Sequence, residues 1–72
     1  MAYGIYYRKG KHDVFKRLTE FYPTNRAKFY VVENGVRGSY RNIRCETEEE
    51  AREIATKQIN TDKYEVKIKE VR

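Results

Sequence analysis

The residues best suited to binding chemistry lie in the segment NGVRGSYRNIR at 34–44, which closely follows the apolar run KFYVV at 28–32. The segment carries three arginines and a tyrosine. Aromatic rings stack on bases and guanidinium groups contact phosphates, so arginine beside tyrosine on a strand is typical of proteins that hold single-stranded nucleic acid. Charged residues of this kind also keep ordinary hairpins soluble. The elements that carry the segment decide between these two interpretations.

Residue types that perform catalysis are scarce. His12 is the sole histidine and Cys45 the sole thiol, so nitrogen and sulfur ligands cannot form a zinc quartet. The chain has no glycine-rich phosphate loop, and nothing in the sequence brings His12 to Ser39 or Cys45. The acidic run at 48–50 is explained by the start of a helix. The sequence therefore predicts a non-enzymatic protein with no cofactor and no metal; a hydrolase or nuclease that uses His12 is a distant alternative.

Positive charge is concentrated in the first part of the chain. The net charge is +5. Residues 1–45 carry ten Lys and Arg against three Asp and Glu, net +7, and residues 46–72 carry six against eight, net −2. This asymmetry predicts a polyanionic partner for one surface, and the alternative is a basic surface that serves solubility alone.

Length and composition predict a single small domain over residues 1–72. The apolar fraction of 39% is below the usual ~45–50%, so we expect one small core and marginal stability. The single cysteine cannot form an internal disulfide, no apolar run approaches the roughly 18 residues of a membrane helix, and the N-terminus does not resemble a signal peptide. We therefore expect a cytoplasmic protein with no membrane association, in the host cytoplasm if the protein is viral.

Local patterns predict one helix and four strands. Thr47 and Glu50 form a capping box at the start of a helix over 47–59. Alternating apolar residues predict strands at 3–8 and 64–71. The dipeptide Asn34-Gly35 predicts a hairpin between the runs on either side of it.

Residues 13–23, DVFKRLTEFYP, predict a second helix. Their apolar residues recur at i, i+1, i+4, i+7 and i+8, Asp13 can cap the helix and Pro23 can end it. The element order is then β-α-β-β-α-β, which predicts an α+β, ferredoxin-like fold with an antiparallel sheet and both helices on one face. If 13–21 is a strand instead, the fold is a β-meander with one helix.

The predicted hairpin register determines which side chains share a face. Residues whose numbers sum to 69 lie opposite each other, so Phe29, Val31, Val36 and Tyr40 share the more apolar face and should contact the helices. The outward residues of the hairpin and of the outer strands then share one open face. The candidate nucleic-acid-binding residues on that face are Tyr6, Arg8, Lys28, Tyr30, Arg37, Arg41, Lys67 and Lys69.

The predicted element order resembles that of RNA-recognition domains, which carry an aromatic signature on the third strand. Residues 37–44, RGSYRNIR, agree with that signature at Arg37-Gly38. They depart from it because Ser39 and Arg41 stand where aromatic rings are expected. The segment 28–59, a basic hairpin followed by a helix, also resembles the sheet-plus-helix DNA readers of the phage-integrase arm type.

We predict from these patterns a small basic protein that holds single-stranded RNA or DNA on the open sheet face. The alternative is a protein-binding module, an inhibitor or adaptor in a cell or of a virus, that uses the same tyrosine-rich face or forms a homodimer. Tyrosine and arginine are also enriched at protein interfaces, so composition does not separate the two classes of partner.

Overall fold

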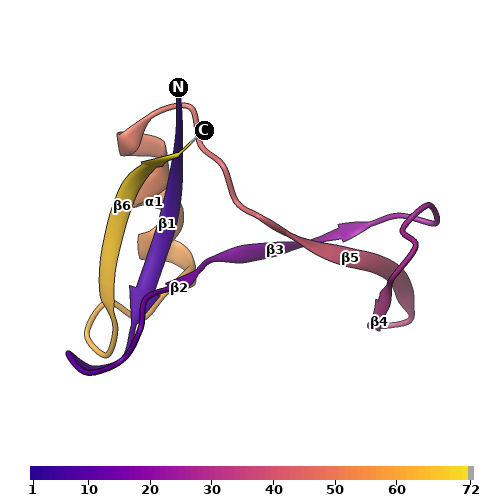
Figure 1. Ribbon diagram of the computed structural model, residues 1–72, viewed down its shortest axis with the longest axis horizontal. Coiled ribbons are helices and arrows are strands. Elements are labelled where there is room, and N and C mark those ends of the chain that lie inside the picture. The colour runs from indigo at the N-terminus through magenta and orange to yellow at the C-terminus, as the bar shows by residue number, and fades with distance from the viewer. Residues whose placement is uncertain (72) are drawn as a thin grey trace.

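The chain folds into a body and a projecting arm (Figure 1). The computed structural model describes residues 1–71. We define the body as residues 1–18 and 43–71, and the arm as residues 19–42. The molecule measures 36 × 27 × 20 Å and its radius of gyration is 13.6 Å, whereas a compact domain of this length has a value of roughly 11 Å. The arm, which stands away from the body, accounts for the difference.

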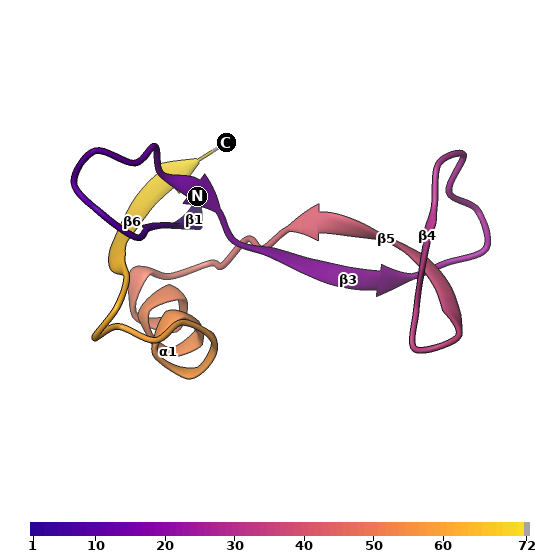
Figure 2. The ribbon, with the colours of Figure 1, turned by 90° about the horizontal axis from the view of Figure 1, so that it is seen from below.

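The body is an antiparallel sheet with a helix on one face. β1 (Ala2–Arg8) lies between β2 (Lys16–Arg17) and β6 (Glu65–Val71). α1 (Glu48–Gln58) covers one face of this sheet, as Figure 2 shows. The strands predicted at 3–8 and 64–71 are therefore confirmed.

The core lies between α1 and the sheet of the body. Ile5 of β1 is completely buried and lies opposite Ile68 of β6. Tyr3 and Tyr7, on the same face of β1 as Ile5, pack against the core, as the alternation predicted. The buried apolar residues within 1–71 are Ile5, Ile43, Cys45, Ala51, Ala55 and Ile59.

α1 forms where the sequence predicts it. Thr47 is the N-cap, and its hydroxyl accepts a hydrogen bond from the Glu50 N–H at 3.1 Å, which is one half of the predicted capping box. Glu48 accepts a hydrogen bond from Arg52 at 2.8 Å, one turn further along the helix. Ile59 is the C-cap and is buried, so the apolar stripe of the helix continues to its end.

The arm is a second antiparallel sheet, and most of it is two strands wide. β5 (Val36–Asn42) lies between β3 (Thr19–Pro23) and β4 (Val31–Glu33). Because β3 pairs with the end of β5 and β4 with its beginning, the two outer strands overlap only opposite Gly38.

The turn between β4 and β5 has the predicted geometry. Asn34 and Gly35 have φ values of 52° and 79°, and two positive φ values in succession are the requirement of a type I′ hairpin turn. Val31 lies opposite Gly38 and Glu33 opposite Val36. The predicted register, in which paired numbers sum to 69, is confirmed over the three residues of β4.

The helix predicted over 13–23 is wrong, because residues 16–17 and 19–23 form β2 and β3 and the rest of the segment is not helical. The Leu18 N–H donates to the Ile5 carbonyl at 2.8 Å, and Phe21 lies opposite Tyr40. Val14, which belongs to the predicted apolar stripe, is 83% exposed. The non-local pairing of β3 with β5 outweighs the helical pattern, since a short amphipathic helix depends mostly on tertiary packing for its stability.

The predicted ferredoxin-like fold is consequently wrong. The strands belong to two small sheets, and the described residues contain one helix in place of two. The β-meander alternative has the observed number of helices, but its strands would form one sheet. The resemblance of 28–59 to sheet-plus-helix DNA readers is not kept in the architecture either, since α1 packs on the body and not on the hairpin.

The predicted burial of one hairpin face is also wrong. Phe29, Val31, Val36 and Tyr40 were expected to contact the helices, but all four are exposed. Their face of the arm lies beyond the reach of α1 (Figure 2).

Candidate functional site

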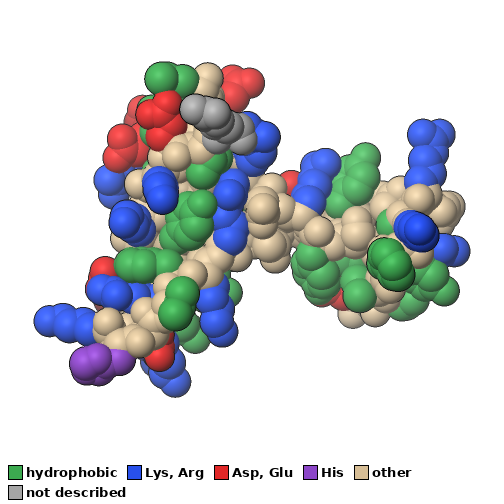
Figure 3. Space-filling view, viewed as in Figure 1, with side chains coloured by type: hydrophobic (Ala, Val, Ile, Leu, Met, Phe, Trp, Pro, Cys, Tyr) green, Lys and Arg blue, Asp and Glu red, His purple; other side chains and the backbone are tan. Residues whose placement is uncertain are grey.

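The predicted site residues divide between the body and the arm. Tyr6, Arg8, Lys67 and Lys69 lie on the body sheet, on the face opposite α1, where Tyr6 is paired with Lys67. Lys28, Tyr30, Arg37 and Arg41 belong to the arm. The prediction of one continuous open face is therefore wrong, because the hairpin joined a different sheet from the terminal strands. Figure 3 shows Lys and Arg side chains on both parts.

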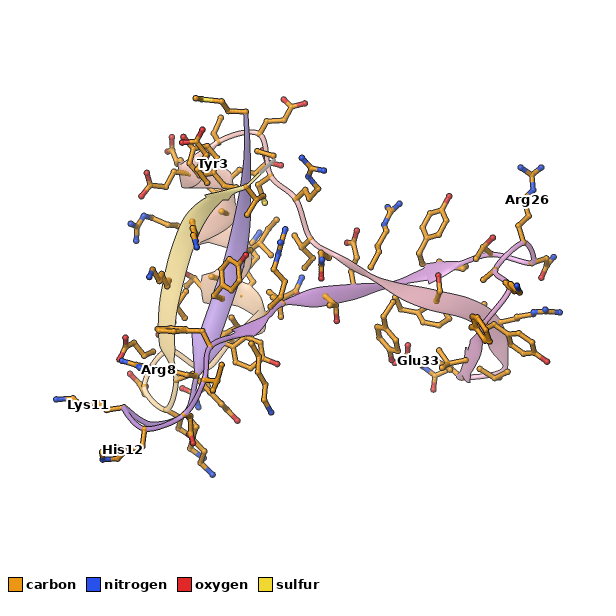
Figure 4. The ribbon with its side chains drawn as sticks, viewed as in Figure 1. Tyr3, Arg8, Lys11, His12, Arg26 and Glu33 are labelled. Atoms are coloured by element: carbon orange, nitrogen blue, oxygen red, sulfur yellow. The ribbon has the colours of Figure 1, made fainter. Side chains whose placement is uncertain are left out.

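The open face of the body holds two arginines, each placed over an aromatic ring. The Arg8 guanidinium lies 4.5 Å from the centroid of Phe15, and the Arg17 guanidinium lies 5.3 Å from that of Tyr6. Arg8 is further held by Glu65 at 3.1 Å and by the Lys11 carbonyl at 3.2 Å (Figure 4). Both guanidinium groups are thus fixed over rings on the uncovered side of the sheet.

Gly4 provides the space for Arg17. A Cβ atom at position 4 would lie 2.7 Å from the Arg17 Cζ, so any larger residue would push the guanidinium aside. Arg17 also donates to the Tyr6 hydroxyl at 3.3 Å and to the Ile43 carbonyl at 3.4 Å. These contacts hold the arginine flat on the sheet.

The arm repeats the arrangement on one of its two faces. Arg37 lies 3.6 Å from the Tyr30 centroid and Arg41 lies 4.0 Å from the Tyr22 centroid. Arg41 also forms an ion pair with Glu20 at 3.2 Å. We call this the arginine face of the arm; its residues are Glu20, Tyr22, Tyr30, Val32, Arg37, Ser39 and Arg41.

Lys28 is only loosely attached to this face. It lies in the connection between β3 and β4, is exposed, and its Nζ is 6.0 Å from the Phe29 centroid. It can reach a ligand on the arm as a flexible charge, but the strand geometry does not orient it.

Sequence reasoning missed Phe15, Arg17 and Tyr22. All three lie within the segment interpreted as a helix, where Phe15 and Tyr22 were assigned to a buried stripe. A strand interpretation of 19–23 would have placed Glu20 and Tyr22 on one face by simple alternation. The missing signal was the pairing of β3 with β5, which is non-local.

Within residues 1–71, two side chains have a raised pKa, and neither suggests catalysis. The hydrogen bond from the Tyr40 hydroxyl to Glu33, at 2.9 Å, raises the pKa of Tyr40 above its usual value. Desolvation in the core raises the pKa of the Cys45 thiol, and the nearby Glu50 and Glu20 carboxylates add to the shift. Cys45 is therefore a protonated, buried thiol at neutral pH, which is the opposite of a nucleophile.

Metal ligands do not converge in the part of the chain that the structure describes. Among residues 1–71 no group of three or more His, Cys, Asp and Glu side chains is close enough to hold an ion. The described site provides aromatic rings, guanidinium groups and positive charge.

Comparison with known proteins does not assign this chain to a family. It matches no protein-family model, no curated protein and no solved structure. Within residues 1–71, α1 has eleven residues and is too short and too polar to cross a bilayer.

Proposed function

We propose that the protein binds single-stranded nucleic acid on the arginine face of the arm and on the open face of the body. The observation that carries the proposal is the set of guanidinium groups placed over aromatic rings. Energetically significant cation–aromatic pairs occur about once per 70–80 residues. Within residues 1–71 four arginines lie over rings, and all four pairs are on sheet faces that α1 leaves open.

Stacked guanidinium and aromatic planes suit unpaired bases. A base can stack on a ring or on a guanidinium plane, and the same guanidinium can contact a phosphate. In a duplex these base surfaces are already stacked on each other, so the arrangement favours single strands. Neither mode of contact reads a particular base, and we expect weak sequence preference.

The charge distribution supports a polyanionic ligand. Lys67 and Lys69 lie on the open face of the body, opposite Tyr6 and Gly4, and neither is within 4 Å of a carboxylate among residues 1–71. The acidic side chains of residues 48–50 begin α1, on the other side of the body sheet. A nucleic acid would therefore meet the sheet face and avoid the helix.

The test is the salt dependence of oligonucleotide binding. Fluorescence anisotropy with a labelled single-stranded DNA and RNA of mixed sequence should show affinity falling steeply with salt. The variant Arg37→Ala with Arg41→Ala should bind more weakly and flatten the log–log slope by about 1.4 to 2, because two phosphate contacts are lost.

A matched control separates the site from net charge. Arg52→Ala with Lys57→Ala also removes two positive charges, but from the exposed side of α1. This variant should keep the slope of the parent protein. If both variants lost the same oligonucleotide affinity, or if the arm variant bound as the parent does, the arm would be excluded as the site. Salt-insensitive binding would favour a protein partner.

A further inference from the structure

The face of the arm opposite the arginines is apolar and uncovered. Val31, Val36 and Tyr40 are 44%, 45% and 53% exposed. The Phe21 ring packs edge-on against Tyr40, with centroids 5.6 Å apart. Among arm residues 19–42, all of which the structure describes, Gly38 alone is buried. We call this the apolar face of the arm; its residues are Phe21, Pro23, Val31, Glu33, Val36, Gly38 and Tyr40.

This face is nearly neutral, so it does not suit the ligand of the arginine face. Glu33 is its one charged side chain within the described residues, and its carboxylate accepts the hydrogen bond from Tyr40. Arg26 and Glu33 project from different sides of the arm (Figure 4). A phosphate backbone would find an acid and no cation here, which excludes a polyanion from this face.

The centre of the apolar face has no side chain projecting from Gly38. At Gly38 the Phe21 ring crosses the neighbouring strand so closely that an added Cβ would lie 2.6 Å from its Cζ. The ring therefore fills the place that a side chain would occupy. Because no side chain projects from Gly38, a second apolar sheet can approach this surface at the usual ~10 Å spacing of stacked sheets.

We infer that the apolar face of the arm packs against the same face of a second copy of this chain. Two properties favour a copy over another partner. The face is compatible with itself, because its single carboxylate is already hydrogen-bonded and none of its own residues is a cation. A two-stranded ribbon is also marginal alone in water, and a second ribbon gives both copies the missing layer of core.

The area agrees with a small dimer interface. The rings of Phe21 and Tyr40 and the two valines offer on the order of 400–500 Å² of apolar surface, together with Phe29, which is 84% exposed and lines one hollow with Val31 and Tyr40. A standard interface takes about 800 Å² from each partner, with up to ~65% of it apolar in homodimers. The arm supplies about that apolar share. Because the arm stands clear of the body (Figure 2), its face is accessible to a second arm.

The inference is independent of the proposed function, and adjacent valines test it. Val31 and Val32 are neighbours on β4, but Val31 lies on the apolar face and Val32 on the arginine face. Sedimentation velocity of nuclease-treated protein, from low micromolar to millimolar concentration, should show a monomer–dimer equilibrium. Val31→Lys should weaken the dimer about tenfold or more, since it places a charge between two apolar sheets.

Val32→Lys introduces the same charge on the same strand and is the control. Val32 is the more exposed of the two, at 63%, yet its replacement should leave the equilibrium unchanged. Isotope-filtered NMR on a mixed labelled and unlabelled sample should show contacts between copies among Val31, Val36 and Tyr40, whether or not the variants fold. A protein that is monomeric throughout, equal weakening by both variants, or contacts between copies elsewhere would overturn the inference.

Discussion

At the residue scale, the two arginines of the arginine face have ring partners in the free protein, and under the proposed function they would exchange these partners for a ligand. An exposed guanidinium–aromatic contact is worth only about 0.5–1 kcal/mol. Arg37 over Tyr30 is such a contact, since Tyr30 is about half exposed. The guanidinium can therefore turn to a phosphate at small cost and leave the ring free for a base.

Tyr30→Ser tests this exchange. The ring is outside the core, so the free energy of unfolding should change little, while oligonucleotide binding should weaken by roughly 1–3 kcal/mol, the usual value of one base–aromatic stack. Chemical denaturation and anisotropy measure the two effects. Tyr64, which packs edge-on against Tyr7 at 5.8 Å beside the core, is the contrasting position. Tyr64→Ser should lower stability by a few kcal/mol instead. A Tyr30→Ser protein that does not fold would remove Tyr30 from the site.

At the element scale, the arm depends on backbone pairing more than on packing. β3 and β5 approach each other closely at Gly38, where an added Cβ would lie 2.4 Å from the Tyr22 carbonyl oxygen. That atom belongs to the backbone and cannot move without separating the strands. Apart from this backbone pairing, few contacts stabilise the outer strands, because the side chains of the arm are largely exposed in a single chain.

Gly38→Ala should therefore destabilise the arm by about 1–3 kcal/mol, as forced overpacking does elsewhere. Amide chemical shifts of 19–23 and 38–42 should move toward disordered values, whereas the helical circular dichroism of α1 should persist. Gly10→Ala serves as the control, since its Cβ would meet Asp13 Oδ2 at an ordinary 3.5 Å. An arm that keeps its shifts in the Gly38 variant would contradict the close approach of β3 and β5.

At the scale of the whole molecule, stability is unequally distributed. The body contains the apolar core, and the arm is joined to it by two strands (Figure 1). Opening of the arm need not unfold the body, and regions with few buried contacts open locally at lower free energy. The molecule should behave as a stable body that carries a less stable arm.

Thr47→Ala tests this division. Loss of the N-cap should lower the free energy of unfolding by about 1 kcal/mol. Hydrogen exchange at low protein concentration should show the loss in the protected amides of β1 and β6, which open by global unfolding. In the parent protein, the amides of β3 and β5 should exchange faster than those of β1 and β6. Their exchange rates should be the same in the variant as in the parent. If the amides of the body and of the arm lost the same amount of protection, the two parts would open as one unit.

The sequence by itself determined the features that depend on neighbours along the chain. The turn at Asn34-Gly35 needs two positive φ values and so implied the register of β4 and β5. The capping residue Thr47 marked the start of α1, and alternation identified β1 and β6. Residue type alone identified the basic and aromatic residues proposed as the binding site, before any contact between them was known.

Only the tertiary structure decided which strands share a sheet and which faces remain open. Residues 13–23 satisfy a helical stripe and a two-faced ribbon equally well, because a ribbon exposed on both sides imposes no one-sided pattern. The outcome rests on the pairing of Phe21 with Tyr40, nineteen positions further along the chain. That pairing separates the arginine face from the apolar face of the arm, and it places both beyond the cover of α1.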